Sequence, residues 1–258
     1  MSSRRDIRRP PVKRRRWPRI LGFAMLVLAA GALALYALSQ SSNAGAAAPS
    51  PSESGPVVRH TPQIDILGDS YVGGSAEGGR GGANWTRLVG TRFYEAGAQV
   101  ELNVMAQPGS GYIARGTTGL VFREAATQRL RPSSDVVVVF GSRNDGRQTE
   151  QAMYEASRLL YADIHRIAPQ AQVVVIGPVW VDANVPDFIV ANNAAMARAA
   201  EQENVTYIDA IAGGWFAEGG QDLIGADGIH PTDAGHSYLA SKIFPLVQEA
   251  IGNLEPGA

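Results

Sequence analysis

Short apolar runs alternate with longer segments of helical period through residues 63–251. Two of the runs, VVVVF at 136–140 and VVVI at 173–176, are continuously apolar and β-branched, as expected of strands buried on both faces. The pattern predicts five strands, at Gln63–Leu67, Val100–Ala106, Asp135–Phe140, Gln172–Ile176 and Thr206–Ile208. It predicts helices at about 83–97, 118–130, 148–168, 187–203 and 232–251. Five such units predict an α/β domain in which helices cover both faces of a five-stranded parallel sheet.

A different hydrophobic pattern precedes this domain. Residues 20–38 contain no charge, and a helix of that length, at about 1.5 Å per residue, nearly spans the hydrocarbon core of a bilayer. Residues 1–19 hold nine Lys or Arg residues and one acid. Because basic flanks stay inside, we expect a cytoplasmic head at 1–19, a transmembrane helix at 20–38 and an extracytoplasmic remainder in a single-pass membrane protein.

A cleaved signal peptide is the alternative, and it would give a secreted protein. Ala44-Gly45-Ala46 offers the small residues that a signal peptidase requires, and Arg15-Arg16 is a loose twin-arginine candidate. The apolar run is longer than the roughly 7–15 residues of a usual signal sequence, which favours the uncleaved anchor. Residues 39–62 are rich in Ser, Ala and Pro and predict a flexible stalk, so the globular domain is residues 63–258.

The net charge of −1 is a cancellation between a head of +8 and a balance of −9 over residues 20–258. An acidic domain argues against nucleic acid as a partner, because contacts to phosphate dominate that affinity. The chain has no cysteine, which excludes a disulfide framework, a thiolate zinc site and a cysteine nucleophile.

Candidate site residues follow four of the predicted strands, and ligands bind beyond the carboxyl ends of strands in parallel sheets. Ser70 follows the first strand, Gly109 the second, Asn144 the third, and the segment from Asp227 to His230 follows the last. A serine hydroxyl attacks only when a base takes its proton. His230 has the chemistry of that base, and Asp227 has the chemistry to hold its imidazole in the right tautomer.

The tetrahedral intermediate of such a reaction needs donors for its oxyanion. The backbone N–H groups of Ser70 and Gly109 and the side-chain amide of Asn144 are the candidates. Each residue alone fits a helix cap or a turn equally well. Their joint placement after successive strands favours catalysis.

Gly68-Asp69-Ser70, Gly109, Asn144-Asp145 and Asp227-x-x-His230 resemble, in order, the four signature blocks of the SGNH (GDSL) hydrolases. The resemblance covers about residues 63–251. It implies a three-layer α/β/α flavodoxin-like domain and esterase, lipase or carbohydrate-deacetylase chemistry without a metal or cofactor. It also implies a role for each matching residue: Ser70 as nucleophile, His230 as base, Asp227 as its orienting acid, and Gly109 with Asn144 in the oxyanion hole.

One position departs from that pattern, since Ser142 stands where the third block usually has glycine. Three other patterns suggest different chemistry or motion. Asp227, His230, Asp233 and His236 recur every three residues as conceivable metal ligands, although Pro231 interrupts them. Residues 109–114 match a dinucleotide fingerprint, but on the second βα turn and not the first. The glycine-rich stretch 73–82 predicts a mobile loop beside Ser70 that could act as a lid.

For substrate contacts we single out Arg143, which could meet an anionic group, and Trp180, which could stack on a sugar ring. The sequence as a whole predicts a membrane-anchored extracytoplasmic serine esterase that cleaves an acyl ester, for example an acetyl group on an envelope glycan. The alternative is an acyltransferase, or a non-catalytic module that binds glycan or lipid, on the same fold.

Overall fold

The computed structural model describes residues 60–217 and 220–254. The predicted basic head, the apolar span and all but the last three residues of the predicted stalk lie outside these ranges. Within them, no helix is both long enough and apolar enough to cross a membrane.

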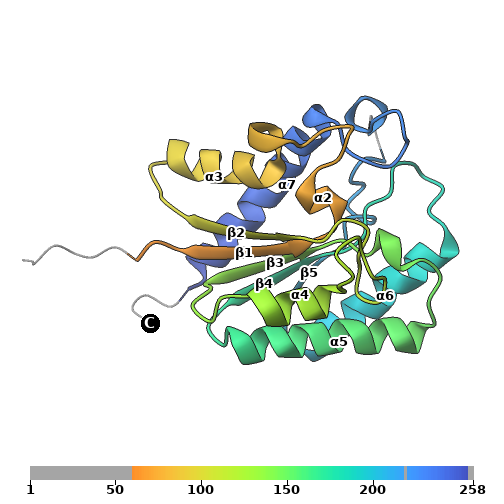
Figure 1. Ribbon diagram of the computed structural model, residues 1–258, viewed down its shortest axis with the longest axis horizontal. Helices are drawn as coiled ribbons and strands as arrows, with labels where there is room; N and C mark the ends of the chain where they lie inside the picture. The colour runs from red at the N-terminus through yellow and green to blue at the C-terminus, as the bar shows by residue number, and fades with distance from the viewer. Residues whose placement is uncertain (1–59, 218–219, 255–258) are drawn as a thin grey trace, which may run out of the picture. The chain divides into compact units, whose positions relative to one another are not determined.

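The described part folds as alternating strands and helices, as Figure 1 shows. The strands are β1 (Gln63–Gly68), β2 (Glu101–Ala106), β3 (Val136–Phe140), β4 (Gln172–Ile176) and β5 (Thr206–Ile208). The helices are α2 (Ser70–Gly73), α3 (Trp85–Glu95), α4 (Phe122–Arg129), α5 (Glu150–Ile167), α6 (Asp187–Gln202) and α7 (Asp233–Gly252). Three short 3₁₀ turns, η1 (Gly81–Ala83), η2 (Arg143–Asp145) and η3 (Gly220–Leu223), lie in the connections.

All five strands are parallel, in the order β2-β1-β3-β4-β5. Ile66 of β1 is in register with Val104 on one side and Val138 on the other. The chain moves outward from β1 to β2 and then returns past β1 to β3, so the order reverses between β1 and β3. The crevice beyond the carboxyl ends of two such strands is where open α/β sheets place their ligands. Ser70 and Asn144 follow these two strands.

Alternate residues of the central strands pack into two separate cores, because successive side chains of a strand point to opposite faces. Ile64, Ile66 and Val138 pack with α3 and α7 on one face. Val137 and Val139 pack with α4, α5 and α6 on the other. Figure 1 shows these two helical layers above and below the sheet. The predicted three-layer α/β/α fold with a five-stranded parallel sheet is confirmed.

The element bounds agree with the predicted ones to within two residues except at two places. Helix α4 begins four residues later than predicted, because Gly119 has a φ of 77° and donates to the Gly116 carbonyl in a turn. The four residues of α2 were not predicted as a helix, since one turn is too short to show a hydrophobic period.

Candidate active site

Ser70 stands at the junction of β1 and α2, at the carboxyl end of the sheet. The Asp69 side chain caps α2 by accepting the Tyr71 N–H at 2.9 Å. As the first residue of the helix, Ser70 has an N–H without a partner inside it. Gly68 is required just before, because a Cβ there would lie 2.2 Å from the Phe140 carbonyl oxygen of β3. Ser70 therefore begins its helix beside the end of β3, at the crevice where the strand order reverses.

The structure brings together the three residues predicted to act on one proton. Nε2 of His230 lies 2.9 Å from Oγ of Ser70, and Nδ1 of His230 lies 2.6 Å from Oδ2 of Asp227. The hydrogen bond to His230 and the backbone N–H groups beside it lower the pKa of Asp227 to about 2. An ionised Asp227 accepts a hydrogen bond from Nδ1–H of His230, and in this tautomer Nε2 is the acceptor for the serine hydroxyl.

Two side chains that follow the nucleophile hold the loop that carries this pair. The Tyr71 hydroxyl donates to the Ile229 carbonyl at 2.5 Å. Oε2 of Glu77 accepts the Ala226 N–H at 2.9 Å. The Asp227–His230 loop is therefore attached at both ends to the segment that begins at Ser70.

The glycine-rich stretch 73–82 packs against the first turn of α7, which differs from the expectation of a free lid. A Cβ at Gly78 would lie 2.4 Å from the carbonyl carbon of Thr232, and one at Gly79 would lie 2.0 Å from Nε2 of His236. The Gly79 N–H donates to Oδ1 of Asp233 at 2.9 Å. These glycines permit close backbone contact, which the sequence pattern alone does not distinguish from flexibility.

Asn144 contacts Asp69, the residue before Ser70, and both hydrogens of its amide are engaged with the protein. Its Nδ2 donates to Oδ2 of Asp69 at 3.1 Å and to the Ser110 carbonyl at 2.9 Å. An oxyanion would have to replace one of these two acceptors. Asp69 is 1% exposed, and this burial, with the nearby Asp145 carboxylate, raises its pKa to about 7.

Gly109 lies on the loop after β2, and Asp145 holds this loop in place. The buried Asp145 carboxylate accepts the N–H groups of Tyr112 at 3.1 Å, Ile113 at 2.7 Å and Ala114 at 2.9 Å. Burial raises the pKa of this carboxyl, and these three donors oppose the shift. In a dinucleotide fingerprint such amides would face a pyrophosphate. Here an internal carboxylate occupies them, which argues against the nucleotide interpretation.

Ser142 has a backbone conformation that favours glycine, with φ of 115°. The side chain is buried, and its Oγ has no hydrogen-bond partner among the described residues. The positive φ explains why the third signature block usually has glycine at this position, and serine adopts this φ only with strain.

We expect Ser142→Gly to raise the free energy of unfolding by about 1–3 kcal/mol. Glycine adopts a positive φ without strain, and the substitution removes a buried hydroxyl that has no partner. The larger backbone entropy that glycine loses on folding offsets part of this gain. Ser142→Ala is the matched control, because it removes the hydroxyl and keeps Cβ. Urea denaturation of both variants measures the difference. Equal stability of the two variants would contradict strain at φ.

The two predicted substrate contacts meet each other. Cζ of Arg143 lies 4.2 Å from the centroid of the Trp180 ring, so the guanidinium covers one face of the indole. Trp215 belongs to the core, where it is 6% exposed. Trp180, which follows β4, remains partly accessible.

The four residues of the conceivable metal set do not gather. Asp233 accepts from Gly79, and the fully buried His236 accepts the Trp85 N–H through Nδ1 at 3.4 Å. Burial lowers the pKa of His236 to about 4, so this side chain is neutral inside the α3–α7 contact. Among the described residues, no group of three or more His, Cys, Asp or Glu side chains could hold a metal ion.

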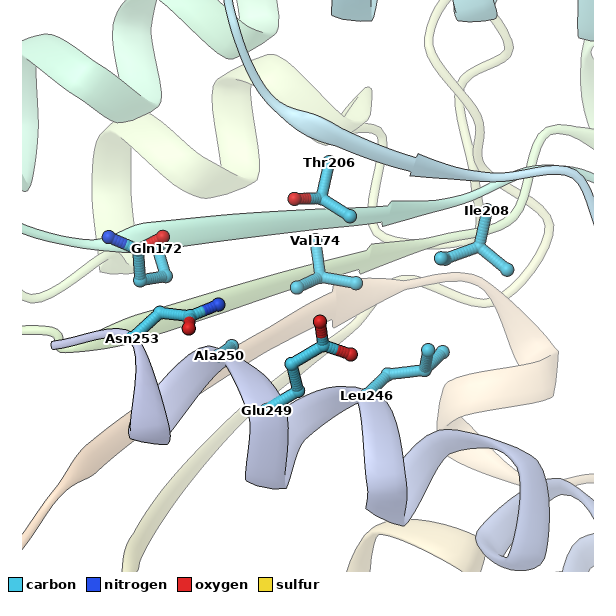
Figure 2. A pocket seen from close by; sticks show the side chains of 8 residues that line it. All are labelled: Gln172, Val174, Thr206, Ile208, Leu246, Glu249, Ala250 and Asn253. Atoms are coloured by element: carbon cyan, nitrogen blue, oxygen red, sulfur yellow. The ribbon is translucent and has the colours of Figure 1, made fainter.

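A small cavity lies away from this constellation, between β4, β5 and the end of α7 (Figure 2). Its volume is about 70 Å³, and Gln172 and Thr206, which line it, begin their strands. Its other lining residues come from the rest of these two strands and the last turns of α7, and none of them is a predicted site residue. It is far smaller than the roughly 300 Å³ or more of a ligand pocket.

Sequence reasoning proposed no site role for several residues that position the others: Asp69, Tyr71, Glu77 and Asp145. Asp69 and Asp145 did stand within the motif blocks, which was the available signal. Tyr71 and Glu77 gave none, because their partners at Ile229 and Ala226 lie 158 and 149 residues away along the chain.

The model of the GDSL-like Lipase/Acylhydrolase family matches residues 66–238. A GDSL lipase of Mycobacterium tuberculosis is 36% identical over 193 residues, which cover 73% of this chain and 83% of the relative. The lipase/acylhydrolase from Enterococcus faecalis has a TM-score of 0.58 at 21% identity, covering 77% of this chain and 100% of that one. A family two carbohydrate esterase from Corynascus thermopiles (Myceliophthora fergusii) has a TM-score of 0.59 at 19% identity, covering 75% of this chain and 67% of that one. The two solved structures match in fold.

Proposed function

Because the chain belongs to the GDSL-like lipase/acylhydrolase family, and is therefore a serine ester hydrolase, we propose that Ser70, His230 and Asp227 carry out its chemistry. One observation carries the proposal. A continuous hydrogen-bonded path runs from Oγ of Ser70 through both ring nitrogens of His230 to the Asp227 carboxylate, with steps of 2.9 and 2.6 Å.

In the first half-reaction Oγ of Ser70 attacks the carbonyl carbon of the ester while its proton passes to Nε2 of His230. The imidazolium then gives this proton to the departing alcohol oxygen, and an acyl-serine remains. In the second half-reaction a water attacks the acyl carbon and loses its proton to His230. The acid leaves, and Ser70 recovers its proton. Asp227 stays ionised throughout and stabilises the imidazolium.

The negative charge of each tetrahedral intermediate is received by the N–H groups of Ser70 and Gly109 and by the Asn144 amide. Among the described residues, the Gly109 N–H donates to no other backbone group, so it is available to a ligand. Asn144 reaches the oxyanion by releasing the Ser110 carbonyl, and it keeps its bond to Asp69. One such donor typically contributes about 100- to 1,000-fold in rate.

Covalent labelling tests this assignment. The full chain is assayed with p-nitrophenyl acetate and then treated with a fluorophosphonate, and the adduct is located by mass spectrometry. We expect one phosphonyl group on the peptide that contains Ser70, and turnover that falls in proportion to its occupancy. Protein unfolded in urea is the control and should not react, because Ser70 is then separated from His230. Full turnover with Ser70 completely modified would refute the proposal.

For the substrate we propose a small acyl ester, such as an acetyl group, on an envelope glycan. This rests on an outward-facing domain, which the uncharged run at 20–38 and its basic flank support. Product analysis in the presence of a sugar acceptor checks the reaction type. We expect free acid, whereas an acylated sugar would indicate a transferase, and neither product would indicate a binding module.

We also propose that residues 20–38 remain as a membrane anchor, with the domain outside the cell membrane. Amino-terminal sequencing of the membrane-fraction protein tests this. An intact terminus supports the anchor, and a start near Ala47 would show a cleaved signal peptide instead.

A further inference from the structure

Arg143 is placed for contact with a ligand and has no carboxylate partner in residues 60–217 and 220–254. It begins η2, directly before Asn144, and its side chain is half-buried. Six other arginines pair with carboxylates within 4.0 Å. These are Arg115, Arg123, Arg131, Arg158, Arg166 and Arg198. Arg143 is one of the described arginines without such a partner, and it stands directly beside Asn144.

One nitrogen of this group makes the lack of a partner costly. Nη1 of Arg143 is shielded from solvent and has no hydrogen-bond acceptor among the described residues. A buried donor without an acceptor typically costs about 1–3 kcal/mol, and more when it is charged. Native structures seldom leave such a group unpaired unless a ligand or an ordered solvent species completes the site.

The Arg143 guanidinium lies within electrostatic range of the two residues that flank Ser70. Its charge opposes the effect of burial on the pKa of both Tyr71 and Asp69, the two neighbours of Ser70. The Tyr71 hydroxyl in turn donates to the carbonyl of Ile229, the residue before His230. Arg143 therefore lies close to Tyr71, whose hydroxyl contacts the loop that carries His230.

Two arginine–aromatic pairs lie in this region. The Trp180 ring lies 4.2 Å from Cζ of Arg143 and holds the guanidinium plane in one orientation. Arg147, on the same loop, lies 5.4 Å from the Phe188 ring and also has no carboxylate partner among the described residues. Both arginines lie in the connection between β3 and α5, which follows one of the two strands at the reversal of strand order.

We propose that Arg143, oriented by Trp180, is an anion subsite, and that the natural ester carries a carboxylate or phosphate close to its scissile bond. A planar guanidinium binds both groups through two parallel N–H donors, which a lysine does not provide. The anion supplies the acceptor that Nη1 lacks. This inference rests on the proposed esterase function and specifies its substrate class.

Two pairs of esters test it, with the full chain as enzyme. The acyl-side pair is the p-nitrophenyl half-ester of adipic acid against p-nitrophenyl hexanoate. The alcohol-side pair is 4-acetoxybenzoate against its methyl ester. For each pair the ratio of kcat/KM, anionic over neutral, is measured for wild type, Arg143→Gln and Arg143→Lys. Arg87→Gln is the control for net charge, because Arg87 is exposed on α3, outside the site.

We expect the ratio to exceed one for at least one pair and to fall about 10- to 100-fold in Arg143→Gln, since a hydrogen bond to a charged group contributes about 1.5–3 kcal/mol. Arg143→Lys should recover part of the ratio, and Arg87→Gln should leave it unchanged. The pair that responds tells on which side of the ester the anion lies.

Other results would overturn the inference. If Arg143 only supports the loop, both esters of a pair lose rate equally in Arg143→Gln and the ratio stays constant. The subsite would then be refuted and the esterase would stand. If wild type hydrolyses none of the four esters, the proposed function fails and the subsite fails with it.

Discussion

Replacing Ser70 by alanine is expected to lower kcat on p-nitrophenyl acetate by a factor on the order of 10⁴ to 10⁶. Without Oγ no acyl-enzyme forms, and His230 has no proton to receive from a nucleophile held 2.9 Å away. The donors for the oxyanion remain, so the residual rate is that of water attacking an oriented carbonyl. KM should change much less than kcat, because the alanine removes a reacting atom and little binding surface.

Ser241→Ala is the matched control for this substitution. Ser241 is exposed on α7, where its Oγ donates to the Tyr238 carbonyl at 2.6 Å, and its loss should leave kcat unchanged. Circular dichroism and the urea midpoint of both variants confirm folding. A kcat for Ser70→Ala within tenfold of wild type would exclude Ser70 as the nucleophile.

Replacing Asp69 by asparagine is expected to change how stability depends on pH. Burial raises the pKa of Asp69 from 3.8 to about 7 in the folded protein. Between these values the folded carboxyl keeps a proton that the unfolded one has lost. The contribution of Asp69 to the free energy of unfolding therefore decreases as pH rises, by about 1.4 kcal/mol per unit and about 4 kcal/mol over the whole window.

The stabilising contribution is complete below the unfolded value and is lost as pH rises through about 7. Asparagine does not titrate, so the variant lacks this slope. It also places an amide where Asn144 donates to Asp69 at 3.1 Å, which adds a constant penalty that does not depend on pH. The slope of the difference between wild type and variant is thus the quantity to compare.

Urea unfolding of both proteins between pH 4.5 and pH 8 measures that slope. The variant should gain stability relative to wild type by several kcal/mol toward the upper end. Glu201→Gln, at an exposed position on α6, is the control and should give a flat difference. A flat difference for Asp69→Asn as well would show that the carboxyl is already ionised at the lowest pH.

Much of the fold follows from local pattern. The run at 136–140 is β-branched and apolar at nearly every position, and β3 begins within one residue of its predicted start. The places of Ser70 and Asn144 follow from topology, because β1 and β3 are neighbours and both end at the same edge. His230 was identified through its chemistry, since a serine nucleophile needs a base.

What the pattern did not reveal depends on contacts between distant residues. Asp145 stood out only as part of a motif block, yet its carboxylate accepts three backbone amides, the first 33 residues away. The glycines at 78 and 79 looked flexible, yet they allow the chain to lie against α7. The two hydrogen bonds of the Asn144 amide could not be predicted, because they depend on where Asp69 and the Ser110 carbonyl lie in the folded protein.

The hydrogen bond between Ser70 and His230 joins residues 160 positions apart, one in the first βα unit of the domain and the other in the last. During synthesis the serine therefore emerges long before its base. A growing chain carries an inert hydroxyl until its final helix, α7, has been made and has docked against α3. Activity therefore arises only once nearly the whole domain exists, and in a chain exported as it is made, that moment falls after the domain has left the compartment where it was synthesised.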